Sequence, residues 1–269
     1  MISTVTLEGS SWSVDFERFV DISIPLLFNG PQPNAYGVSP ATSEPCSAGE
    51  LIGDTRQGGS CNFEQYTFIP HCNGTHTECV GHVTNERISV RDCLRDALIP
   101  AQVVTIMPWL GIKSSDRYSS PFEESDLIIC RKAIEDATVL SGVKALVVRT
   151  LPNDDSKLSR EYQETIPPYF STDAIDHLVQ LGIQHLIVDL PSVDRLFDGG
   201  RLSNHRLFWK LREGSFETDD ETRRNATITE LAYVPNEVED GIYMLNLQIA
   251  PFATDASPSR PILFPLVEK

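Results

Sequence analysis

The sequence contains no apolar run of about 18 residues, the length that a membrane-spanning helix needs. Lysine and arginine together number 22 against 38 aspartates and glutamates. The formal charge of -16 argues against nucleic acid and against an anionic membrane surface as partners. Residues 1–10 have neither a basic region nor an apolar stretch, so we expect no secretory signal peptide.

Cysteine and histidine are scarce, with six of each in 269 residues. The paired CxxC spacing that is typical of structural zinc sites does not occur. This cysteine content fits a reducing compartment better than a disulfide scaffold, so we expect a cytoplasmic protein. Internal repeats and low-complexity segments are also lacking, and 41% of the residues are hydrophobic. These properties predict one globular domain spanning residues 1–269.

The scarce metal-binding residue types gather in residues 71–82, HCNGTHTECVGH. This segment holds three of the six histidines, two of the six cysteines and one carboxylate. It follows an aromatic-rich run, residues 63–69, that we expect to be a strand. Such a density of ligand side chains at a strand end predicts a metal site. The alternative is a pair of ordinary buried thiols beside hydrogen-bonded histidines.

The spacing within this segment indicates which side chains converge. If the segment is extended, alternate residues share a face, and Cys72, His76 and Glu78 point the same way. Gly74 lies between them and leaves room for a turn. His82 follows just downstream. Two or three ligands beside a free histidine are typical of a catalytic metal site with an open position.

The rest of the chain alternates expected strands and helices, which predicts an α/β protein with a parallel or mixed sheet. We expect strands in residues 20–27, 101–107, 143–151, 183–190, 226–231, 241–252 and 261–266. We expect helices in residues 89–98, 127–140 and 172–181. His177 and His185 are interpreted as surface and structural residues. Residues 29–60 are expected to be a long loop, whose Tyr36 either lines a pocket mouth or lies on a plain surface.

Gly74-Thr75-His76-x-Glu78-x-x-x-His82 resembles the signature of the metal-dependent cyclase/kynurenine formamidase family, H-x-G-T-H-x-D-x-P-x-H, which includes isatin hydrolase-like enzymes. Residues 186–194 and 255–260 are similar to two further family segments, in the family's order. The resemblance implies a swivelling β/β/α fold, in which a mixed sheet forms a barrel-like core with flanking helices. It also implies a homo-oligomer, often a dimer.

Three positions depart from the family signature. Glu78 replaces an aspartate, Val80 replaces a proline, and Cys72 stands where the family has its first histidine. His71 is one position out of register. Either Cys72 replaces that ligand or a local bulge brings in His71, and the strand-face argument favours Cys72.

The resemblance implies a ligand set drawn from both halves of the chain. Its members bind a divalent metal: Cys72 (or His71), His76, Glu78, His205 and Glu230. Glu78 could bridge two ions. A thiolate ligand favours zinc, whereas His71 in its place makes manganese more plausible. His82 remains off the metal and is the expected general base and acid acting with metal-activated water.

The implied activity is metal-dependent hydrolysis of a C–N amide bond, of the arylformamidase type that acts on N-formylkynurenine in tryptophan catabolism. Hydrolysis of a cyclic amide or lactone is the closest alternative, and a non-catalytic binding module on the same fold is another.

Three further features of the sequence can be interpreted. Asp194 is either a site residue or a turn former. Asp255 is expected to pair with Arg260 and to hold the last loop. The charged residues 212–225 look like an insertion relative to the family.

Overall fold

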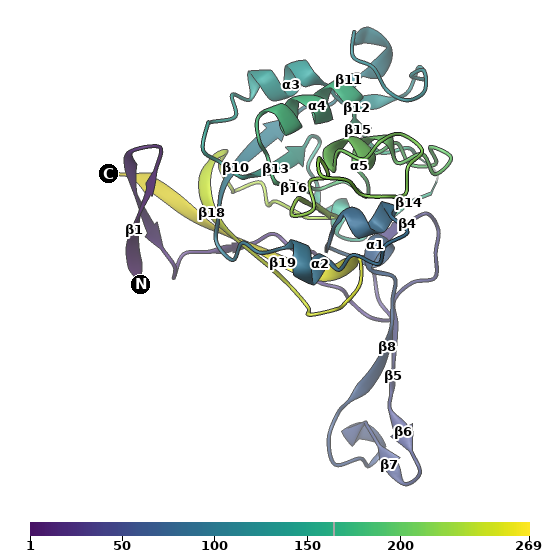
Figure 1. Cartoon of the computed structure of the whole chain (residues 1–269). Coiled ribbons are helices and arrows are strands. Elements are labelled where there is room, and N and C mark those ends of the chain that lie inside the picture. Colours follow the sequence, from purple (N-terminus) through teal and green to yellow (C-terminus); the bar gives the residue numbers. More distant parts are fainter. Residues whose placement is uncertain (164) are drawn as a thin grey trace.

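A mixed sheet that closes into a barrel forms the body of the protein (Figure 1). The computed structural model describes residues 1–163 and 165–269. Around the barrel the strands are β19 (Ala256–Glu268), β18 (Gly241–Ile249), β10 (Ile99–Ile106), β13 (Ala145–Thr150), β16 (His185–Val188), β17 (Thr227–Glu230) and β9 (His76–Glu78). Strand β9 pairs with both β17 and β19 and so closes the ring.

The middle of the sheet is parallel. Strands β10, β13, β16 and β17 run in the same direction, whereas β18, β19 and β9 pair antiparallel with their neighbours. Runs of Val, Ile and Leu form the parallel strands because both of their faces are buried. The mixed sheet and barrel-like core expected from the sequence are therefore confirmed.

Alternate residues of the sheet contribute to two separate cores. Val103 and Val147 face the inside of the barrel, whereas Val104 and Val148 pack outward. The outer face is covered by helices α3 (Arg131–Asp136), α4 (Thr172–Gln180) and α5 (Ser203–Phe208). Ser171 caps α4 by accepting a hydrogen bond from the amide of Ala174 at 3.0 Å.

Smaller elements surround this body. Strands β1 (Ile2–Leu7), β2 (Ser10–Asp15) and β3 (Val20–Asp21) extend the main sheet. An arm that projects from the body in Figure 1 contains β5 (Thr42–Pro45), β6 (Ser47–Ala48), β7 (Leu51–Ile52), η1 (Thr55–Gln57) and β8 (Glu64–Thr67). The remaining short elements are β4 (Asn34–Ala35), α1 (Pro70–Asn73), η2 (Val80–Val83), α2 (Val90–Cys93), β11 (Trp109–Leu110), η3 (Gly111–Lys113), β12 (Leu127–Ile129), η4 (Asp155–Leu158), β14 (Glu161–Tyr162) and β15 (Tyr169–Phe170).

The structure corrects several expected elements. A helix over 127–140 is wrong, because residues 127–129 form β12, which pairs with both β11 and β15, and only α3 is helical. Helix 89–98 shortens to α2. Residues 29–60 are not one irregular loop, since they contain the short strands of the arm. Helix α4 and the segment 212–225, which has no helix or strand, agree with expectation.

No helix in the described part of the chain is long and apolar enough to cross a membrane. His185 is buried in β16, where its Nδ1 lies 2.8 Å from Oγ1 of Thr227, which agrees with its expected structural role.

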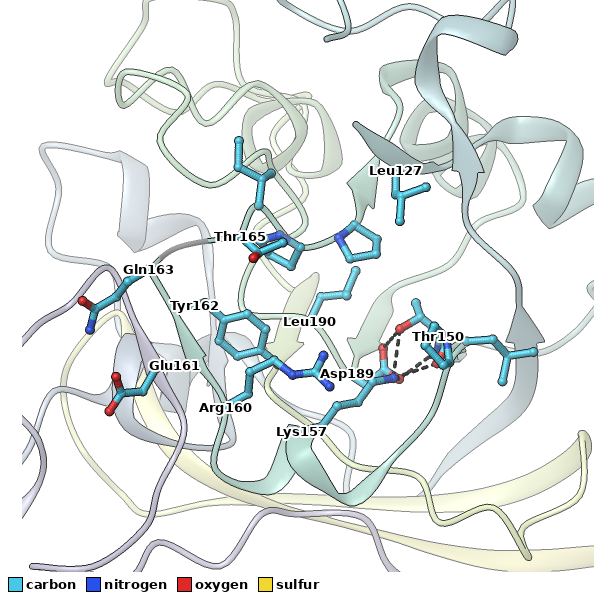
Figure 2. Close-up of a pocket in the computed structure, with 15 residues that line it drawn as sticks. Leu127, Thr150, Lys157, Arg160, Glu161, Tyr162, Gln163, Thr165, Asp189 and Leu190 are labelled. Atoms are coloured by element: carbon cyan, nitrogen blue, oxygen red, sulfur yellow. Dashed lines mark hydrogen bonds and ion pairs between the residues drawn. The ribbon is translucent and has the colours of Figure 1, made fainter. Parts of the chain in front are cut away.

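A buried ion pair joins the segments that follow β13 and β16. Nζ of Lys157 lies 2.7 Å from Oδ2 of Asp189, and both side chains are almost fully buried. Thr150 donates its amide and its hydroxyl to the same carboxylate, each at 2.8 Å. Burial raises the pKa of Asp189, and the charge of Lys157 opposes that rise. Figure 2 shows this pair in the wall of a cavity of about 590 Å³.

We expect Lys157→Met to lower the free energy of unfolding by about 3–5 kcal/mol, because it leaves the Asp189 carboxylate buried without a counter-ion. Lys157→Met/Asp189→Asn removes both charges and should lose less. The control is Lys132→Met, which breaks an exposed Lys132–Asp136 pair and should change stability by at most about 1 kcal/mol. Urea denaturation measures all three. Equal stability of Lys157→Met and wild type would contradict the expected cost of the unpaired carboxylate.

Candidate metal centre

Strand β9 carries two potential ligands on its outward face. His76 and Glu78 are alternate residues and are fully buried, and His76 lies directly opposite Glu230 of β17. Thr77, between them, faces the inside of the barrel, where its hydroxyl lies 2.7 Å from that of Thr229. The sheet register therefore places His76, Glu78 and Glu230 together on the helix-covered face.

His71 reaches this group from a helical turn. Helix α1 begins at Pro70 and ends at Asn73, so the strand alternation expected for residues 71–74 is wrong. The turn brings Nδ1 of His71 to 3.1 Å from Oε2 of Glu78. Within the described residues, Cys72 belongs to none of the clusters that could hold an ion. Burial raises the pKa of its thiol to about 11, and only the thiolate is a good metal ligand.

Helix α5 brings His205 to the other side of Glu78. Its Nε2 lies 2.8 Å from Oε1 of Glu78 and 3.5 Å from Oε1 of Glu230. Its Nδ1 donates to Oδ2 of Asp194 at 2.7 Å. Asp194 also accepts from the amide of Asn204 and thus fixes the start of α5. Asp194 therefore holds the ring and the backbone amide of His205 together with the start of α5, which is the contact expected of a site residue rather than of a turn former.

Two clusters of potential ligands share Glu78. His71, His76 and Glu78 form one cluster, and Glu78, His205 and Glu230 form the other, with ligand atoms within 4.8 Å of one another in each. Oxygen Oε2 of Glu78 faces His71, and Oε1 faces His205. This arrangement is that of a carboxylate placed between two ion positions.

The buried polar atoms fit a cation. Among the described residues, Nε2 of His76 and both carboxylate oxygens of Glu78 have no partner in hydrogen-bond geometry, although ring nitrogens of His205 and His71 lie 2.8 and 3.1 Å from the Glu78 oxygens. Nδ1 of His76 donates to the carbonyl of Gly74 at 3.0 Å, which leaves the lone pair on Nε2 directed at the cluster. Nitrogen and carboxylate donors with their outer atoms held in this way are typical of divalent transition-metal sites.

The charges of the cluster are strongly coupled. Burial lowers the pKa of His71, but its contacts with Asp255 and Glu78 outweigh burial and raise it to about 10. The pKa of His205 is also raised: burial lowers it, but the charge of Glu78 and the hydrogen bond to Asp194 outweigh burial. Burial and the neighbouring His71 lower the pKa of His76 to about 3. His71 and His205 therefore bind protons that a metal ion has to displace.

His82 lies at the partly exposed side of the cluster. Its side chain retains 25% exposure, and its Nε2 lies 3.8 Å from Oε2 of Glu78. Its Nδ1 lies 3.3 Å from Oδ2 of Asp255. The expected pairing of Asp255 with Arg260 is wrong, because Arg260 instead bonds Asp21 at 2.6 Å. Sequence spacing gave no sign that residues 82 and 255 meet, since the contact depends on the pairing of β9 with β19.

Tyr36 lies close enough to the cluster for the charges of Glu230 and His205 to act on its hydroxyl, and Phe197 packs against Tyr36. Tyr36 and Phe197 are partly exposed and pack edge to face, with ring centroids 5.7 Å apart. Both have left-handed backbone, with φ of 62° and 64°, which bulky residues adopt uncommonly. Burial raises the pKa of the Tyr36 hydroxyl, and the negative charge of Glu230 raises it further. The Tyr36 hydroxyl therefore interacts electrostatically with the potential ligands.

Comparisons with known proteins point to one family. A family model described as "Putative cyclase" matches residues 20–195. A kynurenine formamidase from Bacillus cytotoxicus is 26% identical over 258 residues, which is 93% of this chain and 98% of that protein. A kynurenine formamidase from Bacillus cereus is 27% identical over 256 residues, with the same coverage.

Solved structures share the fold. A structure described as a predicted metal-dependent hydrolase from Bacillus stearothermophilus has a TM-score of 0.58 at 15% identity, covering 92% of this chain and 98% of that one. An isatin hydrolase bound to thioisatinate has a TM-score of 0.60 at 17% identity, covering 94% and 93%. These similarities confirm the fold class expected from the sequence.

We expect His71→Ala to lose bound zinc and Cys72→Ala to retain it, because of these two neighbours His71 alone belongs to a ligand cluster in the described part of the chain. Adjacent positions make the two variants a matched pair, and elemental analysis after dialysis measures the zinc. Loss of zinc from Cys72→Ala with retention by His71→Ala would reverse the assignment of these neighbours.

Zinc binding should release protons, and the apparent affinity should rise from pH 6 toward about pH 10. The reason is that the raised pKa of His71, about 10, keeps that side chain protonated at neutral pH. Calorimetry in buffers of different ionisation enthalpy counts the protons released. An affinity that does not change with pH would contradict the protonated state of His71.

Proposed function

Because the chain belongs to the cyclase family, we propose that it is a metal-dependent hydrolase of C–N amide bonds, of the arylformamidase type. The observation that carries this proposal is the buried Glu78 carboxylate shared by two ligand clusters. Support comes from relatives named kynurenine formamidase and from the fold shared with isatin hydrolases. N-formylkynurenine is therefore the first substrate to test.

In this proposal each cluster holds one ion. His71, His76 and Glu78 would hold the first, and Glu78, His205 and Glu230 would hold the second. Zinc is the first candidate, and manganese gains plausibility because the donors are nitrogen and oxygen without a thiolate. When bound, a divalent ion lowers the pKa of water to about 7 and polarises the substrate carbonyl.

His82 moves the proton. Its Nδ1 faces Asp255, so its Nε2 is free on the side of Glu78. From there Nε2 accepts a proton as water adds to the carbonyl carbon. It then delivers that proton to the nitrogen as the C–N bond breaks, which yields a carboxylate product and an amine. The partial exposure of His82 allows its proton to exchange with solvent.

Tyr36 and Phe197 bind the rest of the substrate. Their edge-to-face pair presents aromatic surface beside the ligand clusters. A planar aryl group can stack on either ring, and stacking of this kind contributes about 0.5–1.5 kcal/mol per pair beyond area burial.

Hydrolysis of a cyclic amide or lactone is the second candidate, because a structural relative is an isatin hydrolase. The same clusters and the same proton transfer serve a ring-opening reaction, so the substrate decides between the two activities. A protein that binds metal without turnover is the remaining alternative. We also propose that the chain is a single cytoplasmic hydrolase domain that forms a homodimer and acts in tryptophan catabolism.

We expect the zinc-loaded protein to hydrolyse N-formylkynurenine, and His82→Ala to lower kcat by about 10²–10⁴-fold with zinc still bound. A panel with a formanilide, isatin and an aryl lactone identifies the preferred bond. His177→Ala, on the surface of α4, is the matched histidine control and should retain activity. Unchanged kcat in His82→Ala would remove that residue from its role. A zinc-loaded wild type that hydrolyses nothing in the panel would favour the binding module.

A further inference from the structure

Asp255 lies where two histidines of the site meet. Its Oδ2 is 3.0 Å from Nε2 of His71 and 3.3 Å from Nδ1 of His82. The two imidazole rings lie almost face to face, with centroids 4.3 Å apart and planes tilted by 31°. One carboxylate oxygen therefore contacts a histidine that we assign to the metal and the histidine that we assign to proton transfer.

We propose that Asp255 is a positioning residue that sets the tautomers of His71 and His82 together, an inference that rests on the proposed function. An ionised carboxylate accepts hydrogen bonds and does not donate them. Asp255 therefore holds a proton on Nε2 of His71 and a proton on Nδ1 of His82. A metal ion that displaces the second proton of His71, the one on Nδ1, then finds the lone pair on Nδ1 of His71, and the lone pair of His82 is on Nε2.

The ring nitrogens that do not contact Asp255 both face the same oxygen of Glu78. Nδ1 of His71 lies 3.1 Å from Oε2 of Glu78, and Nε2 of His82 lies 3.8 Å from it. With the opposite tautomers, each ring would direct an N–H group at the ion position. His71 could then not bind a metal ion, and His82 could not accept a proton from water. The single contact at Oδ2 thus selects the active form of both rings.

The backbone holds Asp255 in this place. Its carbonyl accepts a hydrogen bond from the amide of Cys79 at 3.0 Å, directly after Glu78. The next residue, Ala256, begins β19 and pairs with Glu78. Gly81 makes the approach possible, because a Cβ there would lie 2.1 Å from the carbonyl oxygen of Ile88 and 3.3 Å from Cβ of Asp255. The sheet that carries the ligands therefore also places the carboxylate.

The other histidines of the clusters have separate partners. Gly74 accepts from His76, and Asp194 accepts from His205. Asp194 contacts one proposed ligand and does not contact His82 in the described residues. Replacing Asp194 should therefore weaken metal binding alone, whereas replacing Asp255 should affect metal binding and proton transfer together.

The test compares Asp255→Asn with Asp194→Asn in the full-length protein. Asparagine keeps the shape but can donate as well as accept, so it no longer dictates the tautomer of its neighbours. Zinc affinity is measured by competition with a chelator, and two-bond ¹H–¹⁵N spectra of the imidazoles in the zinc-loaded protein report the tautomers. Steady-state kinetics at saturating zinc separate kcat from KM. Asp255→Ala is the second variant, and Arg260→Gln is the control for the last loop.

We expect Asp255→Asn to weaken zinc binding by about 10–100-fold and to lower kcat at saturating zinc by about 10²-fold with little change in KM. The His82 spectrum should lose its single Nδ1–H form. Asp194→Asn should weaken zinc binding but leave the His82 spectrum as in wild type. Asp255→Ala should repeat the tautomer and zinc effects, and Arg260→Gln should have none of them.

The inference is overturned if His71 and His82 keep their tautomers in both Asp255 variants, or if zinc affinity and kcat change by less than about threefold. Zinc affinity and tautomers do not depend on turnover. If the wild-type protein hydrolyses no substrate of the panel, the proposed function fails while these two measurements still decide the role of Asp255. Misfolding of one variant, seen by circular dichroism, leaves the other to decide.

Discussion

The pairing of β9 with β17 on one side and β19 on the other is the constraint on which the fold and the site both depend. These pairings close the barrel. The same register sets His76 opposite Glu230 and brings Asp255 next to the residue that follows Glu78. A three-residue strand thus gathers groups that are up to about 180 residues apart in the chain. Its inward residue, Thr77, bonds across the seam, and its outward residues carry the chemistry.

Two departures from the family signature fall on one ligand cluster. Glu78 is one methylene longer than the aspartate it replaces, and His71 reaches the cluster from one position earlier than the family's first histidine. The helical turn of α1 explains the second departure, because it rotates His71 toward β9. Glu78 is buried between His71 and His205, so the longer side chain still lies between two clusters of potential ligands.

The predictability of each element follows from how local its causes are. Buried β-branched runs identified β10, β13 and β16, and the helix expected over residues 172–181 is α4. The helical spacing of residues 127–140 failed, because β12 pairs with strands that a local pattern cannot reveal. The dense motif located His76, Glu78 and His82. Assuming an extended chain misplaced His71, and the partner of Asp255 was missed because it comes from a strand register.

The seam formed by β9 has a consequence for how the protein responds to loss of its ion. If β9 leaves the ring, β17 and β19 each expose an unpaired edge, and unpaired edges are templates for intermolecular association. The same departure separates His76 and Glu78 from the other potential ligands, so the opened form lacks both ligand clusters. An ion that binds only the closed ring therefore shifts the balance toward closure by mass action. Chelation should therefore make the purified protein associate before it makes the protein unfold.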